Sequence, residues 1–211
     1  MQFQEFLNRK NDLKNVPLLG TEAHLKMASA DRKLSIKKDF YQSKNPKIAA
    51  VLVFLYPKNN ETHMVFMQRN SYEGVHSNQI SFPGGKFEEI DNTLENTALR
   101  ESFEELGIRP ELVEIIKPLS EIYIPPSNFL VQPFLGFSTE NHTFIPDIKE
   151  VSKVIELPLA TILNDDILRY ETLNTSYAKN KQVPVFKIDT TIIWGATAMI
   201  LSEVKEIFKG I

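Results

Sequence analysis

Three glutamates stand close together in the segment RESFEELGI, at Glu101, Glu104 and Glu105. On a helix that turns about 100° per residue, Glu105 lies about 40° to one side of Glu101 and Glu104 about 60° to the other. Like charges at this spacing repel one another. Carboxylates on such a short arc suit a hard divalent cation, Mg²⁺ or Mn²⁺, that would neutralise them. The alternative interpretation is an acidic helix face turned to solvent.

The turn that precedes this segment favours the metal site. Residues 82–85 read FPGG, and glycine lacks the Cβ that would keep a ligand away from the backbone. We therefore predict that the carbonyl of Gly85 completes a metal site begun by the glutamates. Arg100, next to the cluster, is expected to pair with a carboxylate and hold it in position.

Both ends of the helix that would carry the glutamates have sequence signals. Asn92 with Glu95 three residues later predicts a capping box, and Gly107 stands where a C-cap glycine is expected. Counting around the helix predicts an apolar, buried stripe opposite the glutamates. The residues of this stripe are Leu99, Phe103 and Leu106.

The rest of the chain reads as strands around two long helices, which favours a mixed α+β fold. Residues 1–46 are predicted to form a helical extension packed on a main domain over residues 47–211. A C-terminal helix is expected over residues 194–208, with Trp194 and Phe208 in the core. Short apolar runs predict strands over residues 48–57, 63–69, 79–85, 112–124, 129–138, 151–159 and 183–189.

Composition limits the classes of function. The chain has 211 residues, of which 42% are hydrophobic and 24% charged, as in a typical globular protein. A net charge of −3 gives no basic field for nucleic acid, and no apolar run reaches the roughly 18 residues of a membrane span. The chain has no cysteine, and its N-terminus lacks the apolar run of a signal peptide, so we expect a cytoplasmic protein.

The glutamate segment resembles the Nudix box, Gly-x5-Glu-x7-Arg-Glu-U-x-Glu-Glu-x-Gly-U, in which U is a bulky aliphatic residue. The matching positions are Arg100, Glu101, Glu104, Glu105, Gly107 and Ile108. The stretch from Gly85 to Arg100 is one residue longer than in the pattern. Asp91 stands near the place of the first glutamate, and Ser102 replaces an aliphatic residue.

The resemblance implies an α/β/α sandwich around a mixed β-sheet, and hydrolysis of a nucleoside diphosphate linked to another group. It also implies that the helix carboxylates hold divalent ions. By position, Glu101 and Glu105 are the first candidates for metal ligands, followed by Glu104 and the Gly85 carbonyl. The catalytic candidates are Arg100, Glu101, Glu104 and Glu105.

A second stretch, residues 67–86, resembles the upstream motif of coenzyme A pyrophosphatases, Arg-[Ser/Ala]-x3-Arg-x3-Gly-x3-Phe-Pro-Gly-Gly. This resemblance implies coenzyme A or one of its thioesters as the small-molecule substrate. The matches are Arg69, Phe82, Pro83, Gly84 and Gly85, and the departures are Asn70, Gly74 and Asn78. The substrate-binding candidates are Arg69, His76, Gln79 and Phe82.

The sequence leaves several alternatives open. The substrate could instead be ADP-ribose, a dinucleotide or an oxidised nucleotide, or the chain could be a non-catalytic nucleotide-binding Nudix module. We expect no nucleic-acid or membrane partner, and the sequence allows a homodimer. The general base could be a glutamate of the Nudix helix or a carboxylate from a distant loop. The loop candidates, on residue type and location, are Glu121, Asp147 and Glu150.

Overall fold

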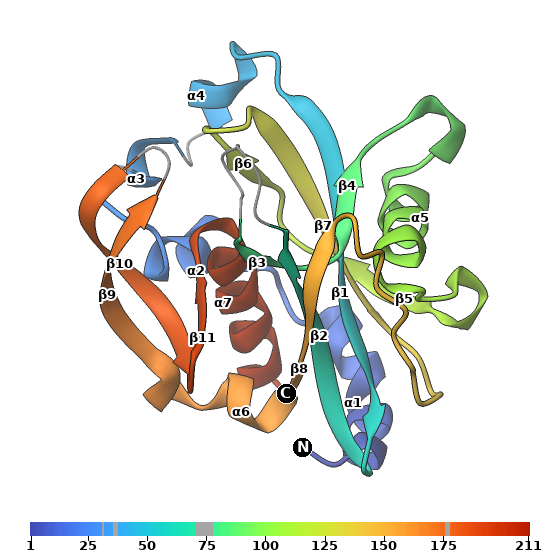
Figure 1. The fold of residues 1–211 in the computed structure, drawn as a ribbon. Coiled ribbons are helices and arrows are strands. Elements are labelled where there is room, and N and C mark those ends of the chain that lie inside the picture. Colours follow the sequence, from blue (N-terminus) through green and yellow to red (C-terminus); the bar gives the residue numbers. More distant parts are fainter. Residues whose placement is uncertain (31, 36–37, 71–77, 176–177) are drawn as a thin grey trace.

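The structure, a computed structural model, describes residues 1–30, 32–35, 38–70, 78–175 and 178–211 (Figure 1). Within these residues, the largest element is an eight-stranded mixed sheet. Its strands are β1 (Lys47–Lys58), β2 (Glu61–Arg69), β3 (Ile80–Ser81), β4 (Gly84–Lys86), β5 (Glu114–Pro118), β6 (Ile122–Ile124), β7 (Phe129–Phe137) and β8 (Val151–Pro158). A separate antiparallel sheet contains β9 (Leu168–Thr175), β10 (Ala178–Ile188) and β11 (Thr191–Trp194).

Helices lie on both faces of the large sheet. α5 (Leu94–Leu106) packs on β1 and β4 on one face, whereas α1 (Phe3–Asn15) and α7 (Gly195–Lys209) cover the other (Figure 1). This arrangement confirms the predicted mixed α+β fold. None of the described helices is both long enough and apolar enough to cross a membrane. The shorter helical elements are α2 (Thr21–Lys26), α3 (Arg32–Ser35), α4 (Lys38–Gln42), η1 (Glu89–Asp91), η2 (Pro110–Leu112), α6 (Leu159–Leu163) and η3 (Asp165–Ile167).

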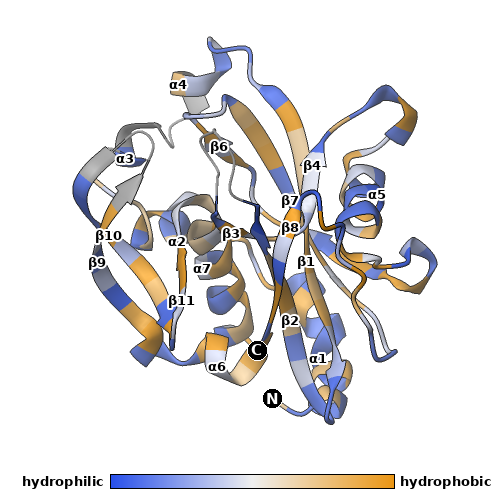
Figure 2. Cartoon of the chain, viewed as in Figure 1, coloured by the Kyte–Doolittle hydropathy of each residue, from blue (hydrophilic) through white to orange (hydrophobic). Residues whose placement is uncertain are grey.

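β1 can lie in the middle of the sheet because both of its faces are apolar. It pairs in parallel with β7 and antiparallel with β2 and β4. Leu52 and Phe54 belong to the apolar cluster under α5, whereas Val53 and Leu55 belong to the cluster shared with α1 and α7. Figure 2 shows the hydrophobic stretches along β1 and β7. The apolar run at residues 48–57 is therefore the buried strand that the sequence predicts.

The ends of α5 confirm one sequence signal and correct the other. Thr93, not Asn92, is the N-cap, and its hydroxyl accepts a hydrogen bond from the Asn96 N–H at 3.1 Å. Asn92 has a φ of 60° at the end of the turn η1, so the predicted capping box of Asn92 and Glu95 is wrong. Gly107 ends the helix with a φ of 71°, as expected.

The buried face of α5 differs from the predicted stripe. Phe103 is 51% exposed, so its predicted burial is wrong, whereas Leu106 is buried as expected. Glu105 is only 2% exposed, because its side of the helix packs against the sheet and the turn at β4. Ser102 is also fully buried, and its hydroxyl donates to the Ala98 carbonyl at 2.6 Å, which satisfies this polar group.

Three strand predictions also differ from the structure. The expected strands over residues 79–85 and 112–124 are each divided, the first into β3 and β4 and the second into β5 and β6. β10 begins at Ala178, before the predicted range of 183–189. β9 and β11 were not predicted, because their partner β10 selects their conformation and their own residues show no clear alternation.

A buried glutamate of α7 fastens the N-terminal segment to the rest of the fold. The Glu203 carboxylate accepts hydrogen bonds from the Gly20 N–H at 2.8 Å, the Ser120 N–H at 2.9 Å and the Ser120 hydroxyl at 2.6 Å. His24 Nε2 lies 3.7 Å from the same carboxylate. Burial alone would raise the pKa of Glu203, but these contacts together lower it to about 2.

We predict that Glu203→Gln destabilises the fold by about 3 kcal/mol at neutral pH, because the charged carboxylate is the form that the contacts favour. The ordinary pKa is 4.5, so this contribution is complete above pH 4.5 and is lost as the pH falls toward 2. Urea unfolding of the wild type and the variant at a series of pH values measures this contribution to the free energy of unfolding. The matched control is Glu206→Gln, which removes a partly exposed ion pair with Lys26 and should cost less than about 1 kcal/mol. Equal losses for the two variants would contradict the prediction.

Candidate active site

The turn before α5 is held against β1 by two glycines. β4 pairs with β1 so that Gly84 lies opposite Val51 and Gly85 opposite Ala50. Gly84 has a φ of +147°, and a Cβ there would lie 2.3 Å from the Ala50 carbonyl oxygen. Both the backbone conformation and the space therefore require glycine. The consequence is that the backbone of β4 can approach the helix carboxylates closely.

Glu105 is buried directly behind this turn. Its Oε2 accepts a hydrogen bond from the Gly84 N–H at 2.8 Å, whereas its Oε1 has no hydrogen-bond partner among the described residues. The guanidinium of Arg69 lies 3.4 Å from Oε1. Burial raises the pKa of Glu105 to about 8. Arg69 and the Gly84 N–H offset part of this rise, and the smaller effects of the negative charges of Glu101 and Glu150 add to it.

Glu101 lies over the second glycine. A Cβ on Gly85 would be 2.4 Å from Cδ of Glu101 and 2.5 Å from its Oε2, so the carboxylate occupies the space that a larger residue would fill. Burial also raises the pKa of Glu101, although Arg100 acts in the opposite direction. The turn thus brings two carboxylates together that both resist ionisation.

Glu104 lies on a different side of the helix. Its side chain is 55% exposed, and its carboxylate is 3.0 Å from Nη1 of Arg100. Among the described residues, no three His, Asp or Glu side chains already form a metal-binding group. Glu101 and Glu105 therefore meet at the glycine turn, while Glu104 joins them only through Arg100.

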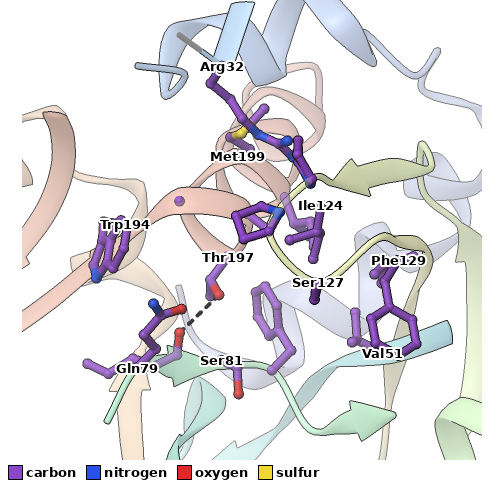
Figure 3. A pocket seen from close by; sticks show the side chains of 18 of the residues that line it. Arg32, Val51, Gln79, Ser81, Ile124, Ser127, Phe129, Trp194, Thr197 and Met199 are labelled. Atoms are coloured by element: carbon purple, nitrogen blue, oxygen red, sulfur yellow. Dashed lines mark hydrogen bonds between the residues drawn. The ribbon is translucent and has the colours of Figure 1, made fainter. Parts of the chain in front are cut away.

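A cavity of about 660 Å³ begins at the glycine turn (Figure 3). Its walls come from β3 and β4, from the N-terminal segment around α3, from residues 124–129, and from the second sheet with the start of α7. Aromatic and aliphatic side chains form most of the surface. They include Phe40, Phe82, Ile124, Phe129, Trp194 and Met199.

The predicted substrate-binding residues meet at this cavity as far as the structure describes them. Arg69, Gln79 and Phe82 all line it. Phe82 also belongs to the core, because it is 2% exposed and its ring centre lies 4.9 Å from that of Phe66. His76 lies outside the described residues.

Trp194 is the lining residue that sequence reasoning placed wrongly. Phe208 is buried in the core as expected, but Trp194 ends β11 and turns its ring to the cavity, where Figure 3 shows it near Gln79. The only signal available was Gly195 directly after it, which has a φ of +64° and marks a sharp passage from strand to helix.

The region that holds the glycine turn and the glutamates matches a known family. Residues 46–171 match the NUDIX domain. The chain belongs to the Nudix hydrolase family. It is 34% identical to Nudix hydrolase 15, mitochondrial, of Arabidopsis thaliana over 163 residues, which are 74% of this chain and 56% of that protein. It thus spans just over half the length of this plant relative.

Other Nudix proteins are similar to this chain over most of its length. An uncharacterised Nudix hydrolase, NudL of Yersinia enterocolitica, is 32% identical over 78% of this chain and 83% of its own. RenU, a Nudix hydrolase of M. smegmatis, shares the fold with a TM-score of 0.53 at 14% identity, over 79% of this chain and 88% of its own. A MutT/nudix family protein of Enterococcus faecalis has a TM-score of 0.50 at 16% identity, over 90% of this chain and 72% of its own.

The arginine of the Nudix box in this chain forms an ion pair with Asp91 despite the altered spacing. Arg100 Nε donates to Asp91 Oδ1 at 2.6 Å and Nη2 to Asp91 Oδ2 at 3.1 Å, while Nη2 also donates to the Lys86 carbonyl at 3.1 Å. The hydrogen bond from Arg100 is the main reason that the pKa of Asp91 falls to about 2. Asp91, near the place of the first glutamate of the pattern, is thus the partner of Arg100, and Asn92 directly after it has a positive φ.

Two departures from the upstream motif have structural explanations. Asn78 has a φ of 58°, a region that asparagine tolerates and that the glycine of the motif would adopt freely. Asn70 donates from Nδ2 to the Ile148 carbonyl at 2.8 Å and from its N–H to the Glu150 carbonyl at 2.9 Å. It thereby holds residues 148–150 beside the site. The third departure, Gly74, lies outside the described residues.

The residues present at the glycine turn fit a divalent cation. Nudix hydrolases generally need such ions. Here a buried carboxylate oxygen of Glu105 lacks a hydrogen bond among the described residues, and the adjacent carboxylate of Glu101 also has a raised pKa. A cation would stabilise the ionised form of both groups and so offset the free energy that their burial costs. Oxygen donors of this kind suit hard ions.

We predict that Gly85→Ala weakens Mn²⁺ binding by about 10- to 100-fold, because the new Cβ displaces the Glu101 carboxylate. Calorimetric titration with Mn²⁺ measures the affinity, and circular dichroism verifies the fold. The control is the pair Glu101→Gln and Gly85→Ala/Glu101→Gln. If Gly85 acts through Glu101, adding the alanine to the glutamine variant has little further effect. A further drop as large as that of the single alanine variant would show that Gly85 acts independently.

Proposed function

We propose that this Nudix protein is a metal-dependent pyrophosphatase that hydrolyses the diphosphate of coenzyme A or its thioesters. The products would be 4′-phosphopantetheine and adenosine 3′,5′-bisphosphate. The observation that carries the proposal is the cavity of about 660 Å³, which begins at Gly84 and Gly85 and has mainly apolar walls. A substrate with a long, largely uncharged arm beside its diphosphate suits such a cavity.

The proposed metal ligands are Glu101, Glu105 and the Gly85 carbonyl, with Glu104 as a further carboxylate on the same helix. Bound Mg²⁺ or Mn²⁺ would supply charge neutralisation at the diphosphate and a water molecule of lowered pKa. Arg100 positions this set, because it contacts both Glu101 and Glu104 as well as the chain before α5. The proposed substrate contacts are Arg69, His76, Gln79 and Phe82.

Glu150 is the proposed general base. Arg69 bridges it to the site, since Nη2 of Arg69 lies 3.5 Å from Glu150 and Nη1 lies 3.4 Å from Glu105. Glu150 also raises the pKa of Glu105 through its charge, so the two carboxylates are close enough to interact. Asp147 is less suited as a base, because its Oδ1 accepts a hydrogen bond from the Lys149 N–H at 2.9 Å and so stabilises the turn at residues 147–149.

Two other functions fit fewer of these features. A Nudix hydrolase of ADP-ribose, a dinucleotide or an oxidised nucleotide would use the same carboxylates but gains nothing from a largely apolar cavity. A non-catalytic nucleotide-binding module would have no need for buried carboxylates with raised pKa values. A cytoplasmic location, a homodimer and the division into residues 1–46 and 47–211 stay predictions.

The first test measures turnover of coenzyme A, ADP-ribose and NADH with Mg²⁺ and with Mn²⁺, with the products separated by chromatography. We expect the highest kcat/KM for coenzyme A, and adenosine 3′,5′-bisphosphate as product. A preference for ADP-ribose or NADH would leave Nudix chemistry with another substrate. Metal-independent binding without turnover would favour the binding module.

Variants of α5 test the proposed metal ligands in the same assay. Glu101→Gln and Glu105→Gln should each reduce kcat by at least about 100-fold, because each removes a proposed metal ligand. Glu95→Gln removes an exposed charge from the first turn of the same helix and should leave turnover unchanged. Wild-type turnover of either metal-ligand variant under saturating Mg²⁺ would refute the assignment.

We predict that Glu150→Gln reduces kcat by about 10²- to 10⁴-fold, the range expected for loss of a general base. Mn²⁺ affinity should change little, because Glu150 is not one of the proposed ligands. The comparison variant is Glu121→Gln, which changes the other loop glutamate that the sequence offers and should retain wild-type kcat. The assignment fails if Glu150→Gln turns over substrate normally, or if it loses Mn²⁺ binding in parallel with kcat.

A further inference from the structure

The charged side chains that line the cavity all have the same sign. Among the described lining residues there are four cations and no carboxylate, and the remaining surface is mainly apolar. The four cations are Arg32, Arg69, Lys86 and Lys181. A ligand that matches this surface has apolar parts and is negatively charged at more than one point.

Three of these cations lie in two different parts of the cavity, and the fourth, Lys181, comes from β10. Arg69 and Lys86 flank the glycine turn, and Arg69 is already engaged with Glu105 and Glu150. Arg32 comes from α3 in the N-terminal segment. In Figure 3 it lies across the cavity from Ser81 and Gln79, which mark the side of the glycine turn. Arg32 thus lies on the wall of the cavity opposite the glycine turn.

Arg32 is held in this position by the neighbouring strand. Its Nη2 donates a hydrogen bond to the Tyr123 carbonyl in β6. The rings of Phe40 and Tyr41 pack on the Tyr123 ring at centre distances of 6.4 and 5.2 Å, which fixes the segment that follows α3 to the same strand. A guanidinium has five N–H donors in a planar fork, a geometry that suits phosphate oxygens.

We propose that Arg32 is a specificity-determining residue, which pairs with a second phosphate of the substrate, remote from the diphosphate that is cleaved. This proposal rests on the proposed pyrophosphatase function and makes the N-terminal segment part of the substrate site. In coenzyme A, the group with this chemistry is the 3′-phosphate. Dephospho-coenzyme A lacks only that group, so the two compounds form a matched pair of substrates.

The test compares Arg32→Gln and Arg32→Lys with the wild type on coenzyme A and dephospho-coenzyme A. Arg32→Gln keeps an amide donor for the Tyr123 carbonyl and removes the charge. We expect its KM for coenzyme A to rise about 10- to 100-fold while kcat stays within about 2-fold. Its KM for dephospho-coenzyme A should not change, and Arg32→Lys should restore part of the preference.

Lys33→Gln is the matched control, because Lys33 stands on the same short helix, is exposed and does not line the cavity. It should leave both KM values unchanged, and thermal unfolding should give similar midpoints for all variants. If Arg32→Gln raises the KM of both substrates equally, the residue shapes the cavity without reading the second phosphate, and the proposal is wrong.

A binding assay separates this proposal from the proposed function. Trp194 is the only tryptophan of the chain and lines the cavity, so its fluorescence reports occupancy without turnover. Adenosine 3′,5′-bisphosphate should bind the wild type more tightly than adenosine 5′-monophosphate, and Arg32→Gln should abolish the difference. If neither coenzyme is hydrolysed but this difference is found, only the proposed function fails. Equal binding of the two nucleotides by the wild type overturns the Arg32 proposal.

Discussion

The arrangement of the site depends on one costly feature, a carboxylate buried behind a backbone turn. Glu105 is 2% exposed, and its only hydrogen bond among the described residues comes from the Gly84 N–H. That bond requires β4 to lie flat on β1, which in turn excludes a Cβ at Gly84. β1 in turn pairs in parallel with β7, which fixes β1 in the middle of the sheet. The fold therefore supplies the rigidity that keeps two repelling carboxylates side by side.

The cavity wall comes from more of the chain than the carboxylates do. The glycine turn and α5 lie within residues 46–171, the part that matches the NUDIX domain. Much of the cavity wall lies outside it, in residues 27–40 and 173–200. Glu203 joins these two outer parts, because it is buried in α7 and binds the backbone at Gly20. A change in either outer part can thus alter the shape of the cavity without moving the carboxylates.

The sequence predicted the elements whose signals are local and failed where tertiary contacts decide. The apolar run of β1 and the C-cap at Gly107 need no knowledge of the fold. The face of α5 was predicted wrongly because counting around the helix placed the buried stripe opposite the glutamates, whereas the structure buries Glu105 and leaves Phe103 exposed. Trp194 and the strands β9 and β11 depend on their pairing with β10, which no local pattern indicates.

The altered spacing of the Nudix box shows which part of the pattern the structure requires. Asp91 is one methylene shorter than glutamate and one residue farther from Arg100 than the pattern has it. Even so, the two side chains form a bidentate pair, because the turn η1 and the positive φ of Asn92 return Asp91 to the helix. The pair then orders Arg100 against Glu101 and Glu104. In this chain the ion pair that fixes the arginine forms although its partners are one residue farther apart than in the pattern.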